Sequence, residues 1–174
     1  MKTLGAILAG GRATRFGSDK AVALLAGRPL LDHALAALRP HVDALIVVGR
    51  PVENQPMVAD WPAPDRGPLG GIAGALRHAA ANGFDQLLSI SVDCVRLPPD
   101  LRAQLDPAPA FLESQPVIGL WPVAARGELE ALLEDDRDRS MRAFARRIGA
   151  RAVIADFVPP NINSPADLDR LADL

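Results

Sequence analysis

Glycines and two cationic side chains follow a short apolar run near the N-terminus, within residues 8–20. Gly10 and Gly11 come directly after the run, and glycine lets the backbone approach a phosphate closely and direct several N–H groups at it. Arg15 and Lys20 then supply positive charge that can neutralise a triphosphate. The spacing is neither the dinucleotide pattern Gly-x-Gly-x-x-Gly nor a Walker loop, because Lys20 has no glycine before it and no serine or threonine after it. The segment indicates a phosphate-binding loop of another kind, with a turn bearing a solvated basic tip as the alternative.

An aspartate closes a second apolar run farther along the chain. Asp93 follows Leu87–Val92, and the carboxyl ends of the strands are where open α/β sheets bind ligands. Mg²⁺ prefers carboxylate and phosphate oxygens and commonly takes only one or two protein ligands. Asp93 is therefore the candidate Mg²⁺ ligand, the alternative being an aspartate that caps a turn at the strand end.

Other reactive side chains give weaker signals. Cys94 directly follows Asp93, but no activating histidine is recognisable in the sequence, so it is interpreted as a small packing residue rather than a nucleophile. His33, His41 and His78 do not form a metal-ligand spacing.

The elements that must position these residues alternate between short apolar runs and stretches of helical spacing. This alternation is typical of an α/β fold with a mostly parallel central sheet flanked by helices. The predicted strands are Leu4–Leu8, Leu45–Val48, Leu87–Val92, Val117–Trp121 and Ala152–Ala155. The predicted helices are Pro29–Leu38, Leu69–Ala81, Leu129–Leu133, Ser140–Ile148 and Pro165–Leu171. Apart from the predicted strand Val117–Trp121, the proline-rich stretches Pro51–Pro68 and Pro98–Pro122 are interpreted as loops or connections. Residues 1–174 are interpreted as one domain.

Composition narrows the class of partner and the compartment. The formal net charge of −2, with interspersed signs, offers no continuous basic surface for nucleic acid. No apolar stretch is long enough to cross a bilayer, and the first apolar run is too short for a typical signal peptide. A single cysteine requires no oxidising compartment, so we expect a cytoplasmic protein without nucleic-acid or membrane partners.

The N-terminal segment resembles the Leu-Ala-Gly-Gly-x-x-x-Arg-x-Gly-x-Asp-Lys signature of nucleotidyltransferases that activate sugars, alditols and pterins. The matching residues are Leu8, Ala9, Gly10, Gly11, Arg15, Gly17, Asp19 and Lys20. The resemblance implies a three-layer Rossmann-like fold. It also implies nucleotide binding by Leu8, Ala9, Gly10, Gly11, Lys20, Asp60 and Asp93, and catalytic roles for Arg15, Lys20 and Asp93.

Two later segments point to one family within this group, the molybdenum cofactor guanylyltransferases. Asp60 with Gly67–Ile72 is similar to the segment that the family uses around its guanine nucleotide, and Asp65 competes for the aspartate position. Asn161–Leu168 is similar to the family's Asn-x-Asn-Ser/Thr-Pro segment beside the acceptor pocket. The resemblance makes Asn161 and Asn163 candidates for acceptor contacts, with an asparagine turn and helix cap as the alternative for one of them.

The resemblance implies transfer of GMP from GTP to molybdopterin or Mo-molybdopterin, with Mg²⁺ as cofactor and other molybdenum-cofactor proteins as further partners. The chain departs from its relatives at Val95, where a proline is usual, at Arg96, and at Val48-Gly49-Arg50, where an asparagine is common. The stretch Leu105–Pro116, which would shape the pterin pocket, is short. Two alternatives therefore stay open: a nucleotidyltransferase for CTP or another nucleotide with a different phosphorylated acceptor, and a non-catalytic protein that binds the nucleotide or the pterin.

Overall fold

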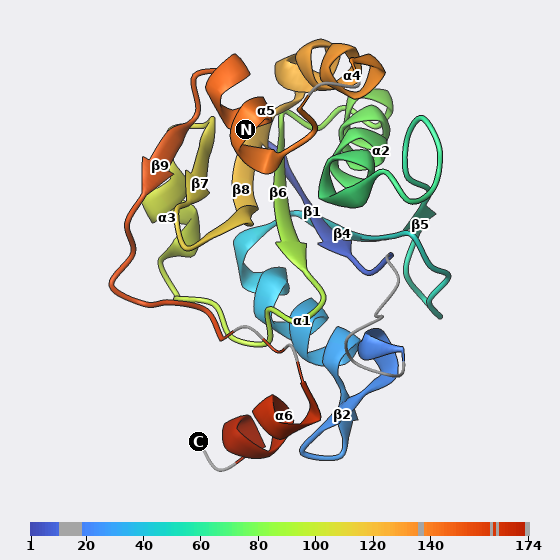
Figure 1. The fold of residues 1–174 in the computed structure, drawn as a ribbon, viewed down its shortest axis with the longest axis vertical. Coiled ribbons are helices and arrows are strands. Elements are labelled where there is room, and N and C mark those ends of the chain that lie inside the picture. Colours follow the sequence, from blue (N-terminus) through green and yellow to red (C-terminus); the bar gives the residue numbers. More distant parts are fainter. Residues whose placement is uncertain (11–18, 136–137, 161, 163, 173–174) are drawn as a thin grey trace.

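A computed structural model describes residues 1–10, 19–135, 138–160, 162 and 164–172. In these residues a seven-stranded sheet lies between two layers of helices (Figure 1). The strands, in their order across the sheet, are β5 (Met57–Val58), β4 (Ala44–Val48), β1 (Thr3–Leu8), β6 (Gln86–Ser91), β8 (Gln115–Pro122), β7 (Ala110–Leu112) and β9 (Arg151–Val153). Only β8 of these strands runs antiparallel to its neighbours, so the sheet is mostly parallel.

Strand β1 shows why the sheet is covered on both faces. All six of its residues are buried, and successive side chains of a strand point to opposite faces. Leu4, Ala6 and Leu8 pack in one core cluster with helices α2 (Gly67–Ala81), α4 (Arg126–Glu134) and α5 (Met141–Arg147). Ile7 packs in the other, with α1 (Leu30–Leu38) and α3 (Leu101–Leu105). The chain therefore forms three layers.

A third, smaller core lies at one end of the sheet. A two-stranded hairpin, β2 (Leu24–Leu25) and β3 (Arg28–Pro29), lies against helix α6 (Pro165–Ala172) in Figure 1. Leu25, Leu30, Val95 and Ile162 form its buried cluster. This cluster joins the loop after β6 to the segment before α6.

The three-layer, mostly parallel architecture predicted from the sequence is confirmed, and each predicted strand and helix overlaps an observed one. Two loop predictions are partly wrong: β5 lies within Pro51–Pro68, and α3 and β7 lie within Pro98–Pro122. These elements have only two to five residues, too few to show a period in the sequence.

Two helix boundaries also differ from the prediction. Pro29 belongs to the β2–β3 hairpin and precedes α1, which begins at Leu30. Ser140 precedes α5 and caps it, because its Oγ accepts a hydrogen bond from the Ala143 N–H at 3.1 Å. In the part of the chain that the structure describes, no helix is both long and apolar enough to span a membrane.

Candidate active site

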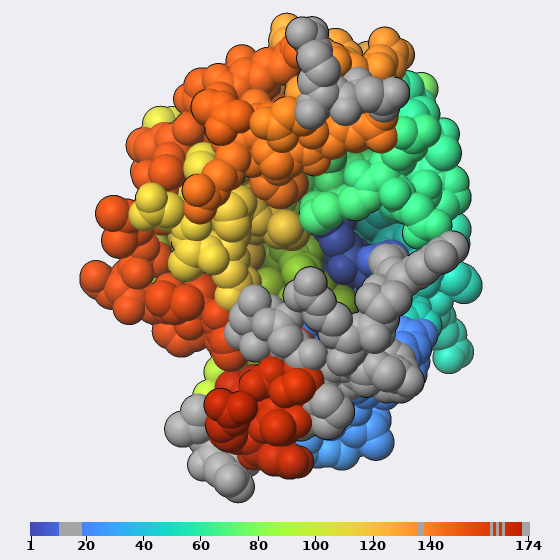
Figure 2. All heavy atoms as spheres, viewed as in Figure 1, coloured from blue at the N-terminus to red at the C-terminus, as the bar shows by residue number. Residues whose placement is uncertain are grey.

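The carboxyl ends of three neighbouring parallel strands meet at one edge of the sheet. Leu8, the last residue of β1, is paired with Val48 of β4 and with Ser91 of β6. The backbone pairing continues beyond the strand, because the Ala9 N–H donates to the Val48 carbonyl at 3.0 Å. In the space-filling view this edge is hollowed, between the start of α2 in green and β8 in yellow (Figure 2).

A cavity of about 190 Å³ lies at this edge. Its lining residues come from all three strand ends, the start of α2 and the neighbouring strand β8: Leu8, Gly10, Val48, Asp60, Gly67, Pro68, Gly71, Ser91 and Val117. The walls are apolar or backbone except for Ser91 and Asp60. Such a small, mostly apolar cavity with one carboxylate suits a planar group that carries hydrogen-bond donors.

Three glycines surround the Asp60 carboxylate. A Cβ atom built on Gly10, Gly49 or Gly71 would lie 3.9, 3.6 or 3.7 Å from Asp60 Oδ1, so side chains there would fill the space around this oxygen. Gly49 is required for a second reason, because its φ is +86° and its Cβ would lie 2.6 Å from the Gly10 Cα. The glycines keep the carboxylate accessible from the cavity.

The Asp60 carboxyl has a raised pKa and accepts no hydrogen bond from the other described residues. Partial burial, and secondarily the charge of Asp65, raise the pKa of the Asp60 carboxyl above its usual value. No hydrogen bond from any other described residue offsets this. An ionised carboxylate accepts hydrogen bonds and donates none, so a ligand with N–H groups would stabilise the charged form.

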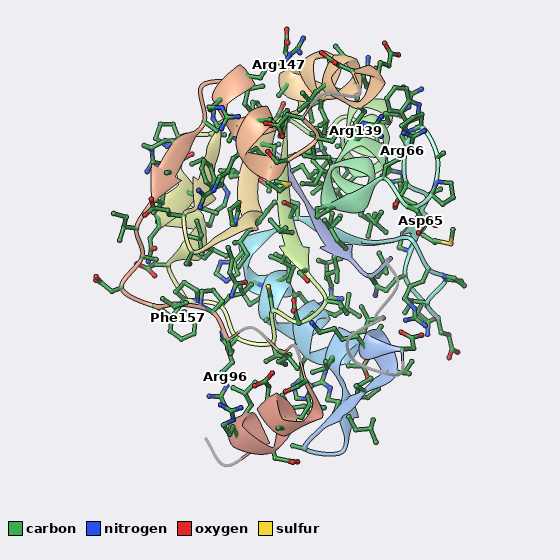
Figure 3. All side chains as sticks on the ribbon, viewed as in Figure 1. Asp65, Arg66, Arg96, Arg139, Arg147 and Phe157 are labelled. Atoms are coloured by element: carbon green, nitrogen blue, oxygen red, sulfur yellow. The ribbon has the colours of Figure 1, made fainter. Side chains whose placement is uncertain are left out.

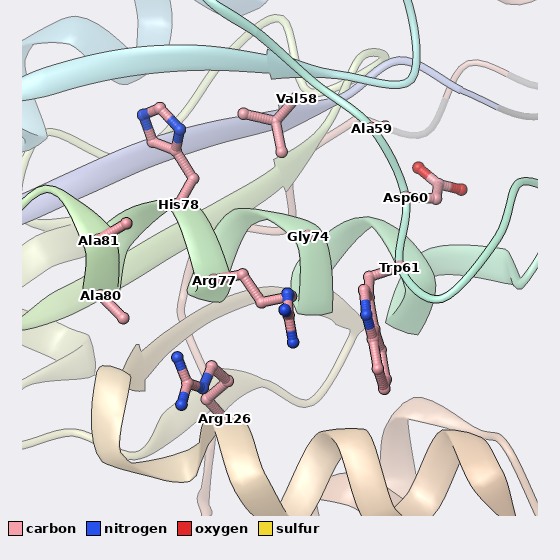
Figure 4. Close-up of a pocket in the computed structure, with 10 residues that line it drawn as sticks. All are labelled: Val58, Ala59, Asp60, Trp61, Gly74, Arg77, His78, Ala80, Ala81 and Arg126. Carbon is pink, nitrogen blue, oxygen red and sulfur yellow. The ribbon is translucent and has the colours of Figure 1, made fainter.

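Asp60 and its neighbour Trp61 point in different directions. In Figure 4 the Asp60 carboxylate is directed away from the outer groove that Trp61, Arg77 and Arg126 line, although Asp60 borders that groove too. Arg77 lies over the Trp61 ring, with its Cζ 5.2 Å from the ring centroid. Asp65, the competing aspartate, is exposed on the loop before α2 (Figure 3) and does not line the cavity.

Lys20 and Asp93 form an ion pair beside the cavity. Asp93 follows β6, and its side chain is 10% exposed. Lys20 Nζ lies 2.7 Å from Asp93 Oδ2, and Lys20 comes from the short 3₁₀ turn η1 (Lys20–Val22) at the end of the glycine loop. The structure thus brings together the predicted phosphate-directed cation and the predicted metal ligand.

The donor set fits the predicted Mg²⁺ site. Among the described residues no group of three or more His, Cys, Asp or Glu side chains could hold a metal ion. A single buried carboxylate fits Mg²⁺, which takes its other ligands from phosphate oxygens and water. Lys20 meets the same carboxylate, so it can compensate the charge of Asp93.

Not all of the predicted site residues line the cavity, because Lys20 and Asp93 are outside its lining. Leu8, Gly10 and Asp60 line the cavity, and Ala9 joins β1 to β4. Gly11, Arg15, Asn161 and Asn163 lie outside the described residues.

The structure also shows the positions of Val95 and Arg96, two of the departures from the family pattern. Val95, where a proline is usual, is buried in the third core with Ile162, and Arg96 is exposed beside α6 (Figure 3).

Burial raises the pKa of the Cys94 thiol to about 12, so it stays protonated at neutral pH and is a packing residue.

The contact between Arg50 and Asp19 was not predicted from the sequence. Arg50, after β4, donates from Nη1 to Asp19 Oδ1 at 2.6 Å. The sequence marks Val48-Gly49-Arg50 only as a departure from the family pattern, and no spacing signal connects positions 31 residues apart. The pairing depends on the adjacency of β1 and β4 in the sheet.

A lysine paired with a buried carboxylate, at the carboxyl edge of a three-layer α/β sheet that also holds a small cavity, fits the site of a nucleotidyltransferase. The chain belongs to the MobA-like NTP transferase domain family, whose model matches residues 5–152. It is 42% identical over 177 residues to a molybdenum cofactor guanylyltransferase of Acidiphilium cryptum (strain JF-5), covering 94% of this chain and 90% of the relative. It is 38% identical over 192 residues to the protein of the same name from Cereibacter sphaeroides, covering 100% of this chain and 97% of the relative.

Solved structures share the fold. The molybdopterin-guanine dinucleotide biosynthesis protein A of Archaeoglobus fulgidus superposes with a TM-score of 0.77 at 20% identity, covering 98% of this chain and 97% of the other. A CMP:2-keto-3-deoxy-manno-octonic acid synthetase complexed with CTP superposes with a TM-score of 0.75 at 13% identity, covering 99% and 98%. At these identities the likeness establishes the architecture, and the choice of nucleotide must come from the site.

Proposed function

We propose that this chain is a molybdenum cofactor guanylyltransferase, which transfers GMP from GTP to molybdopterin or Mo-molybdopterin and releases pyrophosphate. The observation that carries the proposal is the Asp60 carboxylate, surrounded by glycines in a cavity beside the Lys20–Asp93 pair. The names of the relatives support the same substrates.

Asp60 provides the basis for choosing guanine. The N1–H and the N2 amino group of guanine are adjacent donors, and the two oxygens of a carboxylate can accept from both. Adenine presents an unprotonated N1 at the equivalent edge, which would face the carboxylate lone pairs. A site built for donors strongly rejects an analogue that lacks them, because its polar group is left unpaired.

Lys20 and the glycine loop provide the basis for holding the triphosphate. The N–H groups near Gly10 and Gly11 and the ammonium group of Lys20 would bind phosphate oxygens, with Arg15 as a further cation. Mg²⁺ held by Asp93 would neutralise charge on the phosphates and help to orient them. Because Cys94 is buried and stays protonated at neutral pH, it does not act as a nucleophile in this scheme.

The transfer balances as a displacement at phosphorus. An oxygen of the terminal phosphate of molybdopterin forms a bond to the α-phosphorus of GTP, and the bond from that phosphorus to the bridging oxygen breaks. Pyrophosphate leaves with that electron pair. In this scheme the chain contributes positioning and charge neutralisation, the main contributions of proteins to phosphoryl transfer. Asn161 and Asn163 are proposed for the acceptor side.

Pyrophosphate release in the presence of Mg²⁺, GTP and molybdopterin tests the proposal, with mass spectrometry of the pterin product. We expect release that requires both substrates and a product heavier by one guanylyl group. The same assay with CTP and ATP tests the rival nucleotidyltransferases. GTP binding without pyrophosphate release would contradict the proposal and favour the non-catalytic alternative.

A further inference from the structure

Each described end of the glycine loop contacts one of two adjacent residues after β4, Gly49 and Arg50. At the first end, Gly10 packs against Gly49, since a Cβ on Gly10 would lie 3.2 Å from the Gly49 Cα. At the second end, Asp19 accepts the hydrogen bond from Arg50 at 2.6 Å. The Gly49 N–H in turn donates to the Val58 carbonyl at 2.9 Å, which links the segment of Gly49 and Arg50 to the edge strand β5.

Asp19 transmits the position of Arg50 to the turn that carries Lys20. Its Oδ1 accepts the Arg50 bond and also the Ala21 N–H at 3.1 Å, so the same carboxylate caps η1. The side chain of Ala21 is only 2% exposed and packs in the core on the α1 side of the sheet. The turn is therefore held by a buried residue beneath it and by Arg50 beside it.

Adjacent side chains of this turn reach opposite neighbours of β1. Strand β1 lies between β4 and β6. Asp19 binds Arg50 on the β4 side, and Lys20 binds Asp93 on the β6 side. Arg50 and Asp93, which carry opposite charges, thus hold the turn from the two sides of β1.

We propose that Arg50 is a positioning residue of the nucleotide site, which acts through Asp19 to hold Lys20 where the phosphates of the nucleotide bind. The proposal rests on the function proposed above and adds a residue to it. Arg50 lowers the pKa of the Asp19 carboxyl, chiefly through their hydrogen bond, and Asp19 raises the pKa of Arg50. Both groups therefore remain charged at neutral pH. The side chains are 24% and 50% exposed, so the pair contributes little to global stability and its effect is local.

A double-mutant cycle on nucleotide binding tests this role. We expect Arg50→Ala to weaken GTP binding in calorimetry by about tenfold, within the range for a displaced charge-assisted contact. Arg50→Lys should recover most of the loss, because it can still pair with Asp19. In the Asp19→Ala and Lys20→Ala proteins, adding Arg50→Ala should change GTP affinity by less than about twofold, since coupled residues do not act additively.

Arg102→Ala is a matched control. Arg102 pairs with Asp106 at 3.3 Å with side-chain exposures of 27% and 51%, close to those of the Arg50 pair, but it lies on α3. We expect GTP binding unchanged in this variant. Thermal unfolding should shift little in Arg50→Ala and fall in Arg102→Ala, because Arg102 Nη2 also donates to the buried Gln86 Oε1 at 2.7 Å.

Two results would overturn the proposal. Full GTP affinity in Arg50→Ala would show that the turn holds Lys20 unaided. An equal loss in the presence and absence of Lys20 and Asp19 would show that Arg50 contacts the nucleotide directly or acts only on stability. If the protein binds CTP or ATP instead, or releases no pyrophosphate, the proposed function fails, and the same cycle run with the bound triphosphate still decides the role of Arg50. If it binds no triphosphate, both proposals fall.

Discussion

Replacing Asp60 by asparagine should remove the selection for guanine while leaving the fold intact. The amide keeps one oxygen as an acceptor but turns an NH₂ group toward one of the two guanine donors. The loss of one hydrogen bond to a charged group corresponds to about 1.5–3 kcal/mol. At 1.4 kcal/mol per decade this predicts GTP binding weaker by about 10- to 150-fold.

Inosine triphosphate isolates the second hydrogen bond, because inosine lacks the 2-amino group of guanine. The unmodified protein should prefer GTP over inosine triphosphate by about 10- to 150-fold, the effect of one such bond. In Asp60→Asn this preference should fall to about twofold or less. Calorimetric titration with GTP, inosine triphosphate and ATP gives both ratios.

Stability provides an independent check on the same variant. The raised pKa of Asp60 means that the folded protein binds this proton more tightly than the unfolded chain does, so the free energy of unfolding decreases as pH rises from 3.8 through the raised value. Asparagine carries no charge to desolvate, and Asp60→Asn should therefore unfold at a slightly higher temperature at neutral pH. GTP affinity of the unmodified protein should decrease as pH falls through the pKa of Asp60, because the protonated carboxyl presents an O–H donor in place of one of the two acceptor oxygens.

Asp65→Asn is the control for Asp60→Asn, because Asp65 is exposed and outside the cavity. It should keep the preference for GTP within about twofold, since an exposed charge at a distance has a small effect. An unchanged ratio of GTP to ATP affinity in Asp60→Asn would refute the assignment of Asp60.

Three further changes test the rest of the site. Lys20→Ala should lower pyrophosphate release by about 100-fold or more, as for other groups that stabilise developing charge. It should also lower the unfolding temperature, because the buried Asp93 carboxylate loses its partner; near-normal turnover in the folded variant would exclude the role assigned to Lys20. Cys94→Ala should keep turnover within about threefold, and native Cys94 should resist iodoacetamide at pH 7, because burial raises its pKa to about 12. Val95→Ala should cost about 1–3 kcal/mol in denaturant unfolding, because its methyl groups are buried against Ile162; a cost near zero would contradict that packing.

The central strands and long helices could be predicted because their sequence patterns come from burial. Strands β1 and β4 are almost continuous apolar runs, and β6 is buried along most of its length. The buried residues of α2 extend from Leu69 to Ala79, about three turns. The two residues of β5 are too few to show such a pattern, and they form a strand because they pair with β4. Short elements of this kind depend on tertiary contacts.

Some residues of the candidate site could be proposed from the sequence, and some of its contacts could not. Position in the chain and residue type pointed to Lys20 and Asp93, whereas Asp60 was proposed from the resemblance to the family. The structure places these residues, and their roles toward the nucleotide stay predictions. The Arg50–Asp19 pair depends on strand order, and the burial of Val95 depends on a segment 67 residues farther along, at Ile162. The sequence alone contains neither relation.

The central claim is that the cavity at the carboxyl edge binds the guanine of GTP and that the Lys20–Asp93 side of the crevice binds its phosphates. A crystal structure of the protein with GTP and Mg²⁺ tests it most directly. The account expects the N1–H and the 2-amino group of the base on the Asp60 carboxylate, with phosphate oxygens in contact with Lys20. A structure with the base outside this cavity, or with the phosphates bound away from Lys20 and Asp93, would contradict it.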